Sequence, residues 1–388
     1  MGSDNRQTPT FQMPRHTVCL CMIVRNEETV IGRSITSVRC LIDTWVIVDT
    51  GSTDRTIEVV NEAMRGLSGI LVSAPWEGFA SSRNRALSIA RSIAEYVIFL
   101  DADDYAFSCD PERFRSTLAT RNIWSVWAYD GWIRHAKTFA ISSAANARWV
   151  GDVHEYLVAE PTDVVSAEIL PGVAIRYTHQ GARSRDPATF SRDFSALRRT
   201  STTNPEVNEP RRIFYLARTL HLHNEFIAAE CHYSSLVKNE QAPPEMAWLC
   251  AFEACRIREY LGQQKKVSAL QYAQLITQRS SRAEPSIELV RLLRESGRFD
   301  EALALAEYCA TLTVPEDQLF VDISCYRWRA WDEIATVSLL IGNVPAAIEN
   351  GIKALLLPGV PSGDRVRISE NLRTARHMDV SHQALLVN

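Results

Sequence analysis

The sequence predicts two domains of different class: an α/β domain with a mostly parallel sheet, followed by an all-α domain of helical repeats. Two observations support this. Apolar runs alternate with helical patterns through the first hundred residues, and helical periodicity continues from about residue 188 to the end. At 388 residues the chain also exceeds the length of one typical domain. We therefore expect a domain boundary near residue 188.

Four apolar runs and three helical patterns alternate in the first domain. The expected strands are 17–24, 45–48, 69–73 and 96–100, and the expected helices are 27–40, 53–64 and 81–94. This alternation predicts a parallel sheet covered on both faces, because parallel strands need a crossover connection. Ligands of such sheets bind beyond the carboxyl ends of the strands. All these strands except the third end in polar residues.

From about residue 121 the pattern loosens into short strands and loops that contain four tryptophans: Trp124, Trp127, Trp132 and Trp149. Core packing accounts for most of them, and an aromatic platform for a sugar ring or an acceptor remains open.

The sequence of the second domain predicts tetratricopeptide-like repeats. Its helix–helix turns fall at Asn224, Gly262, Gly297 and Gly342, about 35 to 45 residues apart, close to the ~34-residue tetratricopeptide period. Such helix pairs stack into a solenoid, since no pair buries its apolar face alone. We expect this domain over 188–388 to bind a partner or to form a homodimer.

Composition and charge are those of an ordinary globular protein. Hydrophobic residues make up 46% and charged residues 23%, which allows a core without disulfides. The net charge of −4 provides no overall basic field for nucleic acid. The segment from Arg176 to Arg218 contains nine arginines and four acidic residues, so it could bind an anionic ligand.

The thiols and the first residues indicate a cytoplasmic location. Residues 1–15 are polar, lack the apolar centre of a signal peptide and predict a disordered tail. No apolar run approaches the ~18 residues of a membrane span. Nine cysteines without CxxC pairs favour reduced thiols. Cys19 and Cys21 alternate along an expected strand, so they would share one buried face.

The strongest chemical signal is Asp101-Ala-Asp103-Asp104, directly after the fourth expected strand. Three neighbouring carboxylates repel one another and favour a divalent cation. Mg²⁺ or Mn²⁺ prefers oxygen ligands and is commonly shared with substrate phosphates, where it neutralises a nucleoside diphosphate leaving group. The alternative is a solvated acidic turn.

A second signal is VIVDTGSTDRT, in which Asp49 ends a strand and Gly51 permits a tight turn. Asp49 could accept a hydrogen bond from a base N–H or a ribose hydroxyl. The alternative is a strand–turn–helix junction whose polar residues only cap the helix. No GxGxxG or GxxxxGK[ST] pattern occurs, which argues against dinucleotide and P-loop sites.

Four segments in this order, MIVRNEE, VDTGSTDRT, FASSRNRAL and LDADD, resemble family-2 glycosyltransferases of the GT-A fold. RWVGDVHEYL and YTHQGARS then lead into the repeats. The whole arrangement resembles a bacterial subgroup that includes the peptide S-glycosyltransferases of sublancin-type glycocins. The resemblance covers about residues 17–240 and implies a GT-A catalytic domain over 16–187.

The resemblance implies a site for a nucleoside diphosphate sugar, in particular a UDP-sugar. Asp49 would contact the base, Asn26 and Glu27 would line its pocket, and Arg83 would lie near the diphosphate or the donor sugar. Asp101 would face the ribose or the metal. For Arg83, an ordinary surface residue is the alternative.

The resemblance also implies a site for Mg²⁺ or Mn²⁺. Asp103 would hold the metal, with Asp101 as a second ligand. His179 lies where related enzymes can place a histidine near the metal, and a structural histidine is the alternative.

His154 and Glu155 form the candidate catalytic pair. An inverting transfer needs a base that deprotonates the acceptor as it attacks the anomeric carbon. Family-2 enzymes generally place an acidic residue there, which makes Glu155 the first choice and His154 the second. The alternative is that both only stabilise a loop.

We therefore expect an inverting hexosyltransferase whose acceptor is held partly by the repeats. The subgroup favours a peptide cysteine or serine, while the arginine-rich segment leaves modified DNA or a phosphorylated glycan open. A non-catalytic repeat scaffold is less favoured because the acidic motifs are intact. A nucleotidyltransferase is disfavoured because no glycine-rich, lysine-bearing loop lies near the N-terminus.

Overall fold

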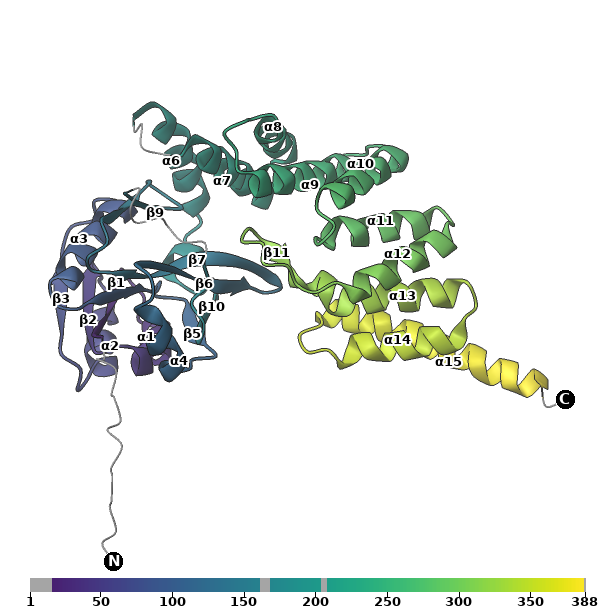
Figure 1. Ribbon diagram of the computed structural model, residues 1–388, viewed down its shortest axis with the longest axis horizontal. Coiled ribbons are helices and arrows are strands. Elements are labelled where there is room, and N and C mark those ends of the chain that lie inside the picture. Colours follow the sequence, from purple (N-terminus) through teal and green to yellow (C-terminus); the bar gives the residue numbers. More distant parts are fainter. Residues whose placement is uncertain (1–15, 161–167, 204–207, 387–388) are drawn as a thin grey trace, which may run out of the picture. The chain divides into compact units, whose positions relative to one another are not determined.

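The computed structural model describes residues 16–160, 168–203 and 208–386, and the expected tail over 1–15 lies outside them. The chain divides into two compact units (Figure 1). Unit 1 contains residues up to Ala128 and Ala136–Thr189, and unit 2 contains Tyr129–His135 and the chain from Phe190 onward. In the described residues no helix is long and apolar enough to cross a membrane.

Unit 1 is built on a sheet whose first half is parallel, as the sequence predicted. The parallel strands are β1 (Val18–Val24), β2 (Thr44–Asp49), β3 (Gly69–Ser73) and β4 (Tyr96–Phe99), in the order β3-β2-β1-β4. The connecting helices are α1 (Ile31–Val38), α2 (Thr56–Ala63) and α3 (Phe79–Arg91), and a 3₁₀ turn η1 (Arg39–Leu41) extends α1. The first predicted helix thus begins four residues late, because residues 27–30 form a turn.

Further strands complete the sheet beyond β4. They are β7 (Ile133–Ser142), β6 (Ile123–Asp130), β10 (Ala174–Arg176) and β5 (Tyr105–Phe107), in that order. Helix α4 (Pro111–Leu118) follows β5, and α5 (Ala182–Arg185) follows β10. A separate two-stranded sheet pairs β8 (Ala147–Val150) with β9 (Tyr156–Ala159).

Two apolar layers cover the sheet, and the alternation of side chains along β1 assigns residues to them. Leu20 and Met22 pack in the layer that contains α1, while Cys19 and Cys21 pack in the layer that contains α3. The prediction that Cys19 and Cys21 share one buried face is confirmed. Trp124 and Trp149 are also buried in these layers, where a fully buried apolar side chain contributes about 1.5–3 kcal/mol.

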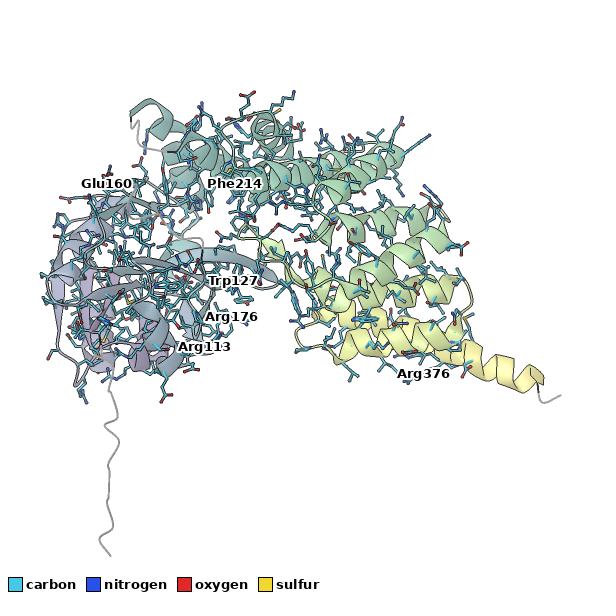
Figure 2. All side chains as sticks on the ribbon, in the orientation of Figure 1. Arg113, Trp127, Glu160, Arg176, Phe214 and Arg376 are labelled. Atoms are coloured by element: carbon cyan, nitrogen blue, oxygen red, sulfur yellow. The ribbon has the colours of Figure 1, made fainter. Side chains whose placement is uncertain are left out.

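Unit 2 is predominantly helical. Its helices are α6 (Thr189–Thr203), α7 (Glu209–Leu222), α8 (Phe226–Val237), α9 (Pro244–Tyr260), α10 (Lys265–Gln278), α11 (Glu284–Glu295), α12 (Phe299–Thr311), α13 (Trp328–Leu340), α14 (Val344–Leu356) and α15 (Ser362–Leu386). Asn224, Gly262, Gly297 and Gly342 all have positive φ and reverse the chain between paired helices, as predicted. Phe214 on α7, labelled in Figure 2, packs against Tyr233 on α8, and their ring centroids are 6.3 Å apart.

The expectation of helix throughout the second half is wrong at residues 321–326. Val321–Asp322 forms a strand, β11, and Ile323–Tyr326 a 3₁₀ turn, η2. Val321 pairs with Arg134 and Asp322 with Ile133, at the start of β7, which belongs to unit 2. Ladder pairing with β7 satisfies these backbone groups, so tertiary contact overrides the helical surroundings.

Candidate active site

The polar residues predicted at the strand ends lie along one edge of the parallel sheet. Val24 is the register partner of Asp49, and Cys21 is the register partner of Phe99. The segments that follow β1, β2 and β4 therefore leave the sheet side by side. This edge is where parallel α/β sheets bind their ligands.

Asp49 organises the turn that follows β2. Its carboxylate accepts hydrogen bonds from the backbone N–H of Gly51 at 3.1 Å and of Ser52 at 3.1 and 3.2 Å. Gly51 has a φ of 102°, a conformation that favours glycine. Asp49 is only 2% exposed, so the turn fixes its orientation tightly.

Asn26 joins the β1–α1 turn to the β2–α2 turn. It has a φ of 57°, its Oδ1 accepts from the N–H of Thr53 at 2.8 Å, and its own N–H donates to Ser52 Oγ at 3.0 Å. Asparagine tolerates this left-handed conformation better than most residues. The two turns therefore form one hydrogen-bonded unit.

Glu27 connects the same turn to the segment after β10. Its carboxylate accepts from the N–H of Ala182 at 3.1 Å, and its N–H donates to Thr56 Oγ1 at 2.7 Å. Burial raises the pKa of Glu27 to about 7, against the lowering effect of the Ala182 hydrogen bond. Glu27 therefore changes its charge near neutral pH.

Arg83 on α3 brings two predicted motifs together. Its Nε lies 2.6 Å from Glu155 Oε1, and its Nη2 lies 2.6 Å from Asp101 Oδ1. The guanidinium also lies over the ring of Trp149, 5.3 Å from its centroid. Burial opposes the charge of Arg83, but the two carboxylates outweigh it and raise the pKa of Arg83. The surface alternative for Arg83 is wrong, because its side chain is 11% exposed.

Sequence reasoning missed Lys137, which binds the acidic motif from β7. Its Nζ lies 2.6 Å from Asp101 Oδ2 and 2.9 Å from Asp104 Oδ2, and 4.8 Å from the centroid of the Tyr177 ring. Burial raises the pKa of Asp104 to about 7. For Asp101, Arg83 and Lys137 overcome burial and hold the pKa well below its usual range. The only sequence signal was a lysine within the strand IRHAKTFAIS.

Asp103 is held by the segment that contains His179. Its Oδ2 accepts from the N–H of Gly181 at 3.2 Å, and its carbonyl oxygen accepts from Thr178 Oγ1 at 2.7 Å. A Cβ on Gly181 would lie 2.8 Å from Asp103 Oδ2, so this approach requires glycine. Within the described residues, no cationic side chain pairs with Asp103.

The described residues contain no group of three His, Cys, Asp or Glu side chains arranged to hold a metal. Asp101 is engaged by Arg83 and Lys137, whereas none of the cationic side chains that the structure describes pairs with the Asp103 carboxylate. A single carboxylate fits an Mg²⁺ or Mn²⁺ ion that takes its remaining ligands from water and substrate phosphates.

His154 and Glu155 lie in the turn between β8 and β9. His154 has a φ of 51° and Gly151 a φ of 102°, so the turn contains two left-handed residues. For a histidine such a conformation is uncommon and carries strain. The turn places Glu155 beside Arg83, with its side chain 12% exposed.

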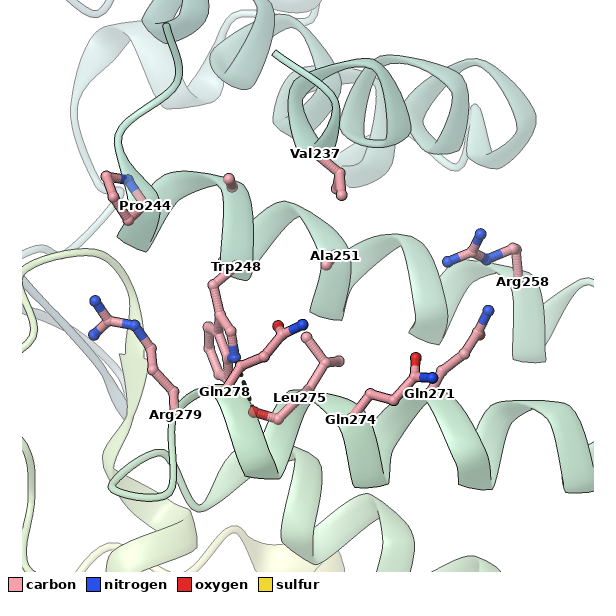
Figure 3. Close-up of a pocket in the computed structure, with 11 residues that line it drawn as sticks. Val237, Pro244, Trp248, Ala251, Arg258, Gln271, Gln274, Leu275, Gln278 and Arg279 are labelled. Carbon is pink, nitrogen blue, oxygen red and sulfur yellow. Dashed lines mark hydrogen bonds between the residues drawn. The ribbon is translucent and has the colours of Figure 1, made fainter. Parts of the chain in front are cut away.

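A separate pocket of about 590 Å³ lies within unit 2, between α8, α9 and α10. Ala247 and Ala251 of α9 are among its lining residues, and Gln271, Gln274 and Gln278 line it from α10 (Figure 3). The indole N–H of Trp248 donates to the carbonyl of Leu275 at 3.0 Å and stabilises the wall. The pocket is therefore lined by side-chain amides from α10 and by small apolar side chains from α9.

Comparison with known proteins relates the two parts of the chain to different groups. Residues 19–119 match the model of glycosyl transferase family 2. A TPR repeat-containing protein of Synechococcus elongatus is 38% identical over 88 residues, which is 22% of this chain and 20% of that protein. An uncharacterized glycosyltransferase of Rickettsia conorii is 31% identical over 83 residues, 21% of this chain and 27% of that protein. The chain thus spans about a quarter or less of these relatives.

Solved structures give partial likenesses. A thermophilic TPR protein of Thermus thermophilus matches with a TM-score of 0.35 and 16% identity, over 48% of this chain and 91% of that one. Glucosyl-3-phosphoglycerate synthase from Mycobacterium tuberculosis, in complex with Mg²⁺ and uridine diphosphate, matches with a TM-score of 0.24 and 24% identity, over 30% and 44%. The family model confirms, for residues 19–119, the resemblance to family-2 glycosyltransferases that the four motifs indicated.

Proposed function

We propose that unit 1 is the catalytic domain of an inverting glycosyltransferase, which moves a hexose from a nucleoside diphosphate sugar, preferably a UDP-sugar, to an acceptor. The observation that supports this best is the bridge from Asp101 through Arg83 to Glu155, at the ligand-binding edge of a family-2 sheet. It joins the acidic motif expected at the donor to the residue expected to act on the acceptor.

The donor would bind along the carboxyl ends of β1, β2 and β4, which lie side by side. Asp49 would receive the base, with Asn26 and Glu27 forming the wall of that pocket. All three are fixed by backbone hydrogen bonds before any ligand binds. Such preorganisation lowers the entropy lost on binding.

Asp103 would hold Mg²⁺ or Mn²⁺, with His179 nearby as the second candidate. When bound, the metal would neutralise the charge of the departing diphosphate. The cations Arg83 and Lys137 leave Asp101 little capacity for a metal, so we assign Asp101 to positioning Arg83 near the donor.

Glu155 would take the proton from the acceptor as its nucleophile attacks the anomeric carbon in line with the departing diphosphate. Arg83 orients the Glu155 carboxylate through Oε1. His154, in its left-handed turn, is the alternative base.

The acceptor would be a peptide whose cysteine or serine is glycosylated. Gln271, Gln274 and Gln278 support this, because side-chain amides both donate and accept hydrogen bonds and so complement a peptide backbone. We assign the pocket in unit 2 to acceptor binding. A cytoplasmic location and a homodimer stay predictions.

The experiment is a comparison of Glu155→Gln with wild type in UDP-sugar turnover and in UDP binding. Glutamine keeps the shape but cannot accept the proton, so turnover should fall on the order of 100-fold while UDP affinity is unchanged. Glu77→Gln, which alters an exposed carboxylate paired with Arg85, is the control. A parallel loss of UDP affinity would make Glu155 a structural residue.

A further inference from the structure

Two cysteines of unit 1, Cys40 and Cys109, lie near the C-terminal end of α1. Cys40 lies in η1 and is exposed, while Cys109 lies in the turn between β5 and α4 and is half-buried. The Cys109 thiol donates to the carbonyl of Ser37 at 3.5 Å, one helical turn before Cys40. Residues three apart on a helix lie on one face, which places Cys40 on the side of the helix that Cys109 contacts; burial and then the Cys40 thiol raise the pKa of Cys109.

The backbone holds both thiols in place. Ser108 has a φ of 54°, and the N–H of Asp110 donates to the carbonyl of Gly172 at 2.7 Å, so Cys109 is fixed on both sides. On the other side, Arg115 of α4 donates to the carbonyl of Leu41 at 3.0 Å and ties α4 to η1. The segments that carry the two cysteines therefore stay together.

A row of contacts connects this pair to the acidic motif. Along α1, Arg33 Nη2 donates to the carbonyl of Asp103 at 3.2 Å and Ser34 Oγ to the carbonyl of Asp101 at 3.0 Å. One turn later, Ser37 Oγ accepts from the N–H of Ala106 at 2.9 Å. Helix α1 thus contacts residues 101–109 along their length, and we call this set of contacts the brace. Cys40 and Cys109 lie beside the contact that Ser37 makes.

We propose that Cys40 and Cys109 are a reversible disulfide site, which closes under oxidation and locks the brace between α1 and the segment 101–109. The other described cysteine with an exposed side chain, Cys231, lies in unit 2 and has no part in it.

The reaction is an exchange with a low-molecular-weight disulfide such as oxidised glutathione. The exposed Cys40 thiolate attacks one sulfur of that disulfide and releases one thiolate, leaving a mixed disulfide on Cys40. The Cys109 thiol then loses its proton to water and attacks Cys40 Sγ, which releases the second thiolate. The protein loses two thiols and two small thiols form. Because burial raises the pKa of Cys109 to about 11, Cys40 is the thiol that reacts first.

The disulfide closes a loop of about 70 residues, which includes β2, β3 and β4, and should raise the melting temperature of unit 1 by about 5 to 10 °C. It should also slow amide hydrogen exchange across residues 101–109, because the brace can no longer open. Both effects should reverse with dithiothreitol.

The test treats the full chain carrying Cys231→Ser with oxidised glutathione, then counts thiols and maps disulfide-linked peptides. We expect two thiols lost per chain, a Cys40–Cys109 linked peptide and the shift in melting temperature. Cys40→Ser, which changes an exposed side chain, should abolish all three. Retention of both thiols, a stable mixed disulfide on Cys40, or linkage of Cys109 to another cysteine would overturn the proposal.

Discussion

Arg83 Nε lies 2.6 Å from Glu155 Oε1, so a residue of the third helix orients the candidate base on the β8–β9 turn. The same guanidinium binds Asp101 at 2.6 Å through Nη2. One planar cation therefore sets the positions of two acidic groups from different parts of unit 1.

Replacing Arg83 with lysine tests this bridge. Lysine keeps the charge but lacks the fork that reaches both carboxylates, so turnover of a UDP-sugar should fall on the order of 100-fold. Arg85→Lys on the same helix, which alters a pair with the exposed Glu77, should leave turnover unchanged. Equal rates for the two variants would show that the bridge has no role in the reaction.

Lys137→Met should destabilise the fold. It leaves the nearly buried Asp104 without its cation, and breaking a buried ion pair of this kind costs about 3 kcal/mol. Urea denaturation measures the loss. Adding Asp104→Asn, which replaces the buried acid left without its cation by a neutral amide, should recover part of it; a double variant less stable than Lys137→Met alone would contradict the assignment.

The raised pKa of Glu27 predicts a pH dependence of stability. Its value of about 7 in the fold exceeds the ~4.3 of an unfolded glutamate, so the folded state binds the proton more tightly. The free energy of unfolding should therefore fall as pH rises from about 4.3 to 7 and then level off. Glu27→Gln should reduce this dependence of the unfolding free energy on pH, measured by denaturant titration at several pH values. The pKa of Asp104 is also about 7, so Asp104 should account for the dependence that remains. An unchanged slope would show that Glu27 does not titrate in this range.

The pocket of unit 2 predicts a separation of acceptor from donor binding. Changing Gln274 and Gln278 together to alanine removes two exposed amides from α10. The affinity for an acceptor peptide should fall about 30-fold, at roughly 1 kcal/mol for each of the two hydrogen bonds lost, with UDP affinity unchanged. Gln241→Ala, outside the pocket, is the control. Acceptor affinity equal to wild type would remove the pocket from acceptor binding.

The parts of the fold that could be predicted are those set by local periodicity and backbone conformation. The β1–β4 strands follow from short apolar runs, and the repeat turns follow from Asn224, Gly262, Gly297 and Gly342, each of which adopts a positive φ. Strand β11 could not be predicted, because its partner in β7 lies nearly 190 residues away in sequence.

The residues of the candidate site also divide into those that could be predicted from the sequence and those that could not. The carboxyl-edge position of Asp49 and Asp101 follows from the strand order and could be read from the alternating pattern. The pairing of Lys137 with Asp101 and Asp104 depends on how β7 is placed beside β4, which local sequence does not specify. A lysine in a strand gives no sign of its partner.

We propose a donor site at the edge of the unit 1 sheet, with its metal on Asp103. Calorimetric titration of the full chain with UDP, with and without Mn²⁺, tests it most directly, with Asp103→Asn as the variant. We expect binding that needs Mn²⁺ in the wild type and is lost in Asp103→Asn, whose melting temperature is unchanged. No binding of UDP or any other nucleoside diphosphate to the wild type, with or without the metal, would contradict it.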